Sequence, residues 1–67
     1  MKSKKMTIKE LRQHLELTQK DFAKMLNITQ VNYSNIENGK NKPSLTTYQK
    51  IKGIMEKQKL DIDDLIF

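Results

Sequence analysis

The sequence predicts an all-α domain of four or five short helices, and three observations predict it. Residues that can cap the start of a helix recur at Thr7, Thr18, Thr29 and Ser44. Apolar residues follow each of them at helical spacing. No segment alternates between apolar and polar residues as a half-buried strand does, so every predicted element is helical.

The first predicted helix begins after Thr7. The letters TIKE form a capping box, in which the Thr7 hydroxyl and the Glu10 carboxylate each accept a hydrogen bond from a backbone amide. Ile8, Leu11 and Leu15 then form one apolar stripe, which is the side expected to face the core.

The second predicted helix begins after Thr18. Leu17 and Phe22 can form a hydrophobic staple across its start, which fixes the angle at which the chain enters. The residues predicted to face inward are Phe22, Ala23, Met25 and Leu26. Asn27 is predicted to end the helix in the left-handed conformation, which asparagine tolerates better than most residues.

The third helix is predicted to run from Gln30 to about Asn38. Tyr33 and Ile36 face the core in this pattern, and Gly39 ends the helix. The outward side is predicted to consist of Gln30, Val31, Ser34 and Asn35.

A fourth helix is predicted after the basic loop 40–43, with Ser44 as its cap. Its expected apolar residues are Leu45, Tyr48, Ile51, Ile54 and Met55. Gly53 lies inside this helix at a cost of about 1 kcal/mol relative to alanine, so the helix depends on packing. Asp61 or Asp63 is predicted to begin a last helical turn.

Length and composition limit the possible functions. We expect a single domain over residues 7–67, with one small core and no room for an internal catalytic cavity. The chain has no cysteine, which excludes disulfides and thiolate metal sites and favours a reducing cytoplasm. No apolar run approaches the roughly 20 residues of a membrane helix, so no membrane partner is expected.

The charge is +5 and is unevenly distributed. Residues 1–60 carry 13 basic and five acidic side chains, a net of +8, whereas residues 61–67 have a net of −3. Such a basic body suits a phosphate-bearing partner, although a solvated lysine-rich surface is the simpler alternative. Residues 1–6 are predicted to form a flexible basic arm, which either follows a nucleic-acid backbone or only keeps the protein soluble.

The outward side of the third helix has the chemistry of a DNA-reading surface. An α-helix fits the major groove, where glutamine and asparagine amides can pair with adenine and Val31 could contact a thymine methyl group. The predicted base-reading residues are Gln30, Val31, Ser34 and Asn35. The predicted phosphate-binding residues are Gln19, Thr29, Asn38, Lys40 and Lys42. The alternative is an ordinary polar face of a soluble helix.

Residues 7–45 resemble the helix-turn-helix domain of the phage Cro/cI repressor family, also called Xre-type regulators. The matching letters include LTQ, DFAKML, ITQ, NIENGK and KPSL. The resemblance implies a compact lambda-repressor-like fold, with the helix-turn-helix formed by the second and third helices. It implies a sequence-specific regulator of transcription, expected to be a repressor, which binds double-stranded DNA. Such a protein would act at the nucleoid, in the cytoplasm of a bacterium. Its gene would belong to the bacterium or to a phage.

The resemblance also implies roles for single residues. Gln30 would be the leading base reader, and Arg12 would form an internal ion pair with Glu37. A direct contact between Arg12 and a base is the alternative. Asn27 replaces the usual turn glycine of the family. Tyr33 replaces a β-branched aliphatic residue, so its ring must fill a larger core or its hydroxyl must reach the rim.

One such module makes few contacts with DNA, and helix-turn-helix proteins usually bind palindromic operators as two-fold dimers. The predicted homodimer interface is the C-terminal apolar set Ile62, Leu65, Ile66 and Phe67. The alternative is that these residues only close the core of the monomer.

The sequence leaves two other classes of function to consider. One is an antitoxin-like protein-interaction module on the same fold. The other is an enzyme, which the sequence disfavours because His14 has no carboxylate partner that the sequence can place. Asp61, Asp63 and Asp64 resemble a metal cluster in composition only, since helix capping explains them. We therefore expect no catalytic residue, metal, cofactor or small-molecule ligand.

Overall fold

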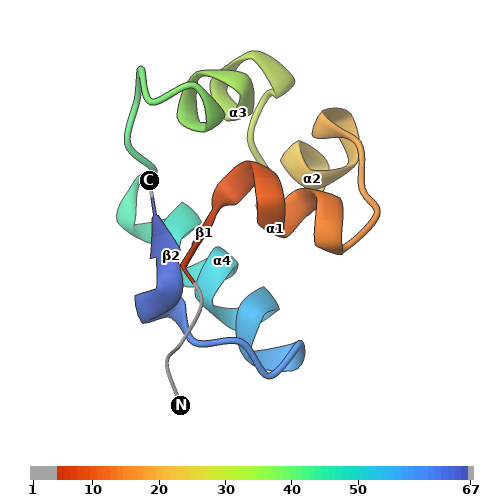
Figure 1. Ribbon diagram of the computed structural model, residues 1–67. Coiled ribbons are helices and arrows are strands. Elements are labelled where there is room, and N and C mark those ends of the chain that lie inside the picture. Colours follow the sequence, from red (N-terminus) through yellow and green to blue (C-terminus); the bar gives the residue numbers. More distant parts are fainter. Residues whose placement is uncertain (1–4, 67) are drawn as a thin grey trace.

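The computed structural model describes residues 5–66 and contains four α-helices in this range (Figure 1). They are α1 (Ile8–His14), α2 (Gln19–Leu26), α3 (Gln30–Glu37) and α4 (Leu45–Lys57). A 3₁₀ turn, η1 (Ile62–Asp64), and two short strands, β1 (Met6–Thr7) and β2 (Leu65–Ile66), complete the described elements. The predicted order of helices and the all-α, lambda-repressor-like class are confirmed.

The two strands correct the expectation that every element is helical. Met6 pairs with Leu65 and Thr7 pairs with Ile66 in a parallel ladder, and the Lys5 ammonium donates to the Asp63 carbonyl at 3.0 Å beside it. Two-residue strands are too short to show alternation, so no sequence pattern could announce them. Met6, assigned to the basic arm above, therefore belongs to β1 and is half-buried, while residues 1–4 lie outside the described residues.

Each helix begins at its predicted capping residue. The hydroxyls of Thr7, Thr18, Thr29 and Ser44 each accept a hydrogen bond from the amide three residues further on. At Thr7 the box is complete, because the Thr7 amide also donates to a Glu10 carboxylate oxygen at 2.8 Å. Each cap stabilises its helix by about 1 kcal/mol, which matters for helices of this length.

A left-handed residue lies just after each of the four α-helices of the described chain. Asn27 has φ 59° and ψ 42° at the end of α2, as predicted, and Gly39 has φ 78° just after α3. Glu16 and Lys59 also have φ 59°. No sequence signal marks these two positions, because residues with long side chains seldom adopt this conformation.

The core lies where the four α-helices meet. Its buried apolar residues are Ile8, Leu11, Phe22, Ala23, Leu26, Tyr33, Ile36, Ile51 and Met55. Two assignments to the core were wrong, because Met25 is 49% exposed and Leu45 is 72% exposed. Leu45 is the first residue of α4 and points outward, while Thr47 takes the buried position and accepts a hydrogen bond from the Ser44 hydroxyl.

Candidate nucleic-acid interface

The helix α3 projects the predicted base-reading residues from the body of the domain. Gln30 and Val31 are exposed, with Val31 73% exposed, and Ser34 and Asn35 are half-buried. Tyr33, on the opposite side of the helix, is fully buried. The structure therefore brings the four predicted readers together on the outward side of one short helix.

The turn between α2 and α3 holds the two helices close together. The Ile28 amide donates to the Ala23 carbonyl at 3.0 Å, and Ala23 is itself buried. The rings of Phe22 and Tyr33 lie 5.3 Å apart at 58°, an arrangement that aromatic pairs favour. The orientation of α3 is thus set by a packed apolar contact with α2.

Four of the five predicted phosphate-binding residues lie at the two ends of α3, and the fifth, Gln19, is the first residue of α2. Thr29 is exposed at its start, while Asn38, Lys40 and Lys42 are exposed beyond its end. The Lys40 amide donates to the Asn35 carbonyl at 2.8 Å, so the basic loop is fastened to the end of the helix. Lys40 and Lys42 therefore lie exposed beside the end of α3.

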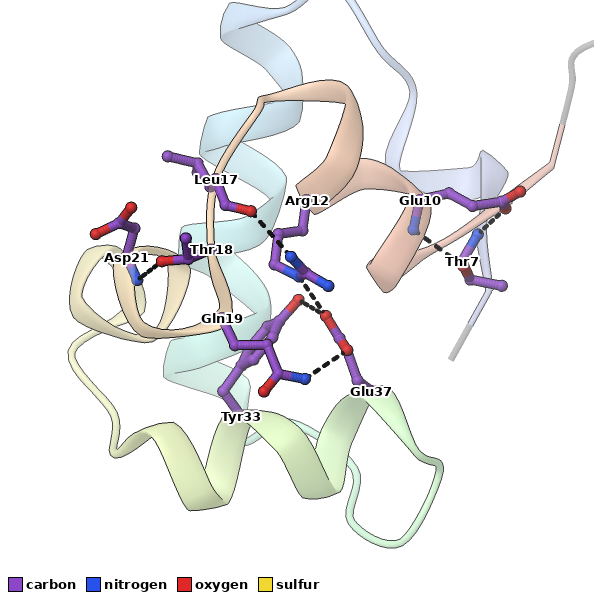
Figure 2. Close-up of polar contacts among 9 residues, drawn as sticks. All are labelled: Thr7, Glu10, Arg12, Leu17, Thr18, Gln19, Asp21, Tyr33 and Glu37. Carbon is purple, nitrogen blue, oxygen red and sulfur yellow. Dashed lines mark hydrogen bonds and ion pairs between the residues drawn. The ribbon is translucent and has the colours of Figure 1, made fainter.

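A carboxylate at the end of α3 collects hydrogen bonds from all three of the first helices (Figure 2). Arg12 Nε and the Tyr33 hydroxyl each donate to Glu37 Oε2 at 2.6 Å, and Gln19 Nε2 donates to Glu37 Oε1 at 2.9 Å. Arg12 Nη1 also donates to the Leu17 carbonyl at 2.9 Å. The side chain of Glu37 is only 3% exposed and that of Arg12 is 14% exposed.

This network, Arg12–Gln19–Tyr33–Glu37, is hereafter called the Glu37 network. It contains the Arg12–Glu37 contact that the resemblance implies. Tyr33 combines both options left open by the sequence, because its ring fills the core while its hydroxyl reaches the carboxylate. The signal for this bond in the sequence is the four-residue spacing of Tyr33 and Glu37, which places them side by side on one helix.

Gln19 has a second role, in the structure of the domain, which the sequence does not predict. It was predicted only as a phosphate ligand, yet its side chain is half-buried and one of its amide hydrogens is directed to Glu37. An amide nitrogen carries two hydrogens, so the second is still available to another acceptor. No signal in the sequence pointed to this bond, because residues 19 and 37 lie on different helices.

The Glu37 network shifts the ionisation of its members. Burial would raise the pKa of Glu37, but the hydrogen bonds from Tyr33, Arg12 and Gln19 outweigh it and lower the pKa below the ordinary 4.5. The hydrogen bond to Glu37 raises the pKa of Arg12. Burial, together with the same carboxylate, raises the pKa of Tyr33. The network therefore keeps a carboxylate, a guanidinium and a neutral phenol at neutral pH.

We expect the stability of the domain to fall at acidic pH through Glu37. Because its pKa is lower in the folded state, the unfolded chain takes up the proton first as the pH falls. The contribution of Glu37 should be fully present above its ordinary pKa of 4.5 and be lost progressively as the pH falls below it. The measurement is the free energy of unfolding in urea from about pH 7 to about pH 3. Glu37→Gln should show a shallower acid dependence, and equal slopes would contradict the assignment.

The predicted C-terminal interface residues differ in exposure. Ile62 and Leu65 are half-buried and pack against the core, whereas Ile66 is 47% exposed. Phe67 lies outside the described residues. The first two therefore help to close the core of the monomer.

Two further features concern the described range, residues 5–66. No group of three or more His, Cys, Asp or Glu side chains in it could hold a metal ion. None of its helices is long and apolar enough to cross a membrane.

A scaffold helix, a tight turn and a second helix that projects polar residues define a helix-turn-helix domain, a DNA-binding class. The family model described as Helix-turn-helix, of the Cro/cI type, matches residues 8–57. The chain therefore belongs to this family of DNA-binding regulators, which generally have no enzymatic activity. Comparisons with curated proteins and with solved structures gave no match.

Proposed function

We propose that this protein is a sequence-specific repressor that binds a palindromic operator as a homodimer, with α3 in the major groove. The observation that carries the proposal is the outward side of α3, where Gln30 and Val31 are exposed on a helix whose other side is buried. Their amide and methyl groups match the acceptors, donors and methyl groups that base pairs present in that groove. Ser34 and Asn35 extend the same surface by one turn.

Phosphate contacts at both ends of α3 would set its register on the duplex. The hydroxyl of Thr29, the amide of Asn38 and the ammonium groups of Lys40 and Lys42 supply donors without reading sequence. Gln19 adds a donor through its second amide hydrogen. A protein with this partner would act at the nucleoid, in the cytoplasm of a bacterium.

The proposed dimer uses the C-terminal end of the described chain. Ile66 supports this proposal because it is a large apolar side chain, 47% exposed, on a strand at the surface. Ile62 and Leu65 would contribute only their exposed parts, and Phe67 completes the proposed set. A two-fold pair would place two copies of α3 about 34–36 Å apart, one turn of B-DNA.

In vitro selection from random duplexes, followed by titration of the selected site, tests this function. We expect selected sites with two-fold symmetry and half-sites about one turn apart. If a dimer neutralises about eight phosphates, log K against log salt should have a slope near −7. A titration with no salt dependence and no preference over random DNA would disprove sequence-specific binding.

A further inference from the structure

A groove with apolar walls lies between α2, the turn before it and α4. The groove consists of two adjoining hollows, and the larger has a volume of about 420 Å³. Its apolar walls are formed by Leu15, Leu17, Met25 and Ile54. It follows the C-terminal halves of α2 and α4. None of the residues that line the groove belongs to α3 or to the basic loop 40–43. An occupant of the groove would therefore leave the outward side of α3 free for DNA.

Met25 is an exposed apolar side chain in the wall of the groove. It lies on α2 between two core residues, Phe22 and Leu26, yet 49% of it is exposed. Methionine is flexible and polarisable, and it is common at surfaces that accommodate a partner side chain. Because Met25 is exposed, no described residue covers the apolar walls of the groove.

Gly53, on α4, is a second feature of the groove that indicates a binding partner. Glycine inside a helix is less stable than alanine, and this glycine has an ordinary helical backbone without positive φ. A Cβ atom added at Gly53 would meet nothing within 4 Å, so the monomer itself does not require the missing side chain. Gly53 lines the groove. The absence of a side chain there is explained if the backbone of a second element approaches α4 closely at this point.

The charges around the groove indicate the chemistry of that element. Lys50 and Lys57 border it, and none of the described residues that line it is acidic. Lysines at the edge of an apolar strip favour a partner whose apolar residues are flanked by carboxylates. An amphipathic helix presents such a strip at i, i+3, i+4 and i+7 spacing, which is the usual way a helix binds a groove.

The acidic segment of a second copy fits less well. Residues 61–66 combine aspartates with apolar side chains, but Ile62 and Leu65 already pack against their own core. Leu65 and Ile66 also pair with β1. Releasing them would break the monomer, so a different protein is the better occupant.

We propose that this groove docks an acidic amphipathic helix of a partner protein, with Gly53 at the point of closest approach. The regulator would then bind a protein and DNA on separate surfaces. Met25 and Ile54 would receive the apolar residues of the partner, and Lys50 and Lys57 would pair with its carboxylates.

The test uses the full chain, labelled with ¹⁵N, and two synthetic helical peptides. Both carry leucines at i, i+3, i+4 and i+7; one has flanking glutamates and the other has lysines in their place. We expect the acidic peptide alone to shift the amide signals of Met25, Gly53 and Ile54. Equal binding of both peptides, no shifts, or shifts confined to the basic loop 40–42 would overturn the proposal. The same shifts on raising the protein concentration without peptide would assign the groove to a second copy and overturn it too.

Gly53→Ala separates docking from stability. The substitution should raise the melting temperature by about 4–8 °C, because alanine is the better helix former. It should also lower the affinity for the acidic peptide at least fivefold, because the added methyl group blocks the close approach. Lys57→Ala should also lower the affinity for the acidic peptide. Lys52→Ala removes the same charge from another side of α4 and should leave this affinity unchanged. Unchanged peptide affinity in Gly53→Ala would contradict the close approach. DNA affinity should be the same in Gly53→Ala as in the parent.

Discussion

Arg12→Ala should destabilise the domain by about 3–5 kcal/mol, because it leaves the Glu37 carboxylate buried without its cation. The side chain of Glu37 is 3% exposed and cannot recover its hydration without a movement of α3. Domains of this size have a total stability of about 3–10 kcal/mol, so this loss is a large fraction of the whole. The measurement is urea denaturation followed by circular dichroism. DNA binding should be lost in parallel, through unfolding.

Two controls isolate the uncompensated charge as the cause. Lys9→Ala changes an exposed cation on the same helix and should alter the stability by no more than about 0.5 kcal/mol. Combining Arg12→Met with Glu37→Leu and Tyr33→Phe replaces three of the four members of the Glu37 network by apolar groups, leaves only the half-buried Gln19 polar, and should recover most of the loss. A triple variant as unstable as Arg12→Ala would show that the loss has another origin, such as the Arg12 bond to the turn before α2.

Gln30→Ala should abolish base preference at one position of each half-site while leaving the fold intact. A bidentate amide contact discriminates between bases by about 1–3 kcal/mol, so the preference for the selected base should fall about 5- to 150-fold per half-site. Gln30 is exposed, so the unfolding curve should be nearly unchanged. Competition titrations with single-base variants of the selected operator measure the effect.

Gln13→Ala is the matched control, since it removes the same side chain from an exposed position on α1. It should leave affinity and base preference unchanged. If Gln30→Ala weakens binding equally on all sequences, Gln30 contacts the backbone. If both glutamine variants behave like the parent protein, α3 does not read the operator through this residue.

Much of the fold was predictable because its signals are local. Thr7, Thr18, Thr29 and Ser44 cap their helices through hydroxyls and amides three residues apart, so a short string of letters contains the whole interaction. The left-handed Asn27 is equally local, because the conformation depends on its own side chain and backbone. The outward side of α3 followed from helical periodicity and required only that Tyr33 and Ile36 face the core.

The errors arose where a position depends on a distant element. Met25 has the spacing of a core residue, but α4 crosses α2 in a way that leaves it at the edge of a groove. Leu45 lies so near the start of α4 that the core does not reach it. The pairing of β1 with β2 depends on where four helices bring residues 6 and 65, which no neighbouring letters encode.

The sequence by itself determined the four helices, their caps and the residues that α3 turns outward, because each depends on atoms within one or two turns. Family resemblance added the pairing of Arg12 with Glu37. Only the tertiary structure decided that Tyr33 and Gln19 donate to the same carboxylate, and that Met25 and Gly53 line a groove. These arrangements depend on the angles at which helices cross, and those angles are set by packing over the whole core.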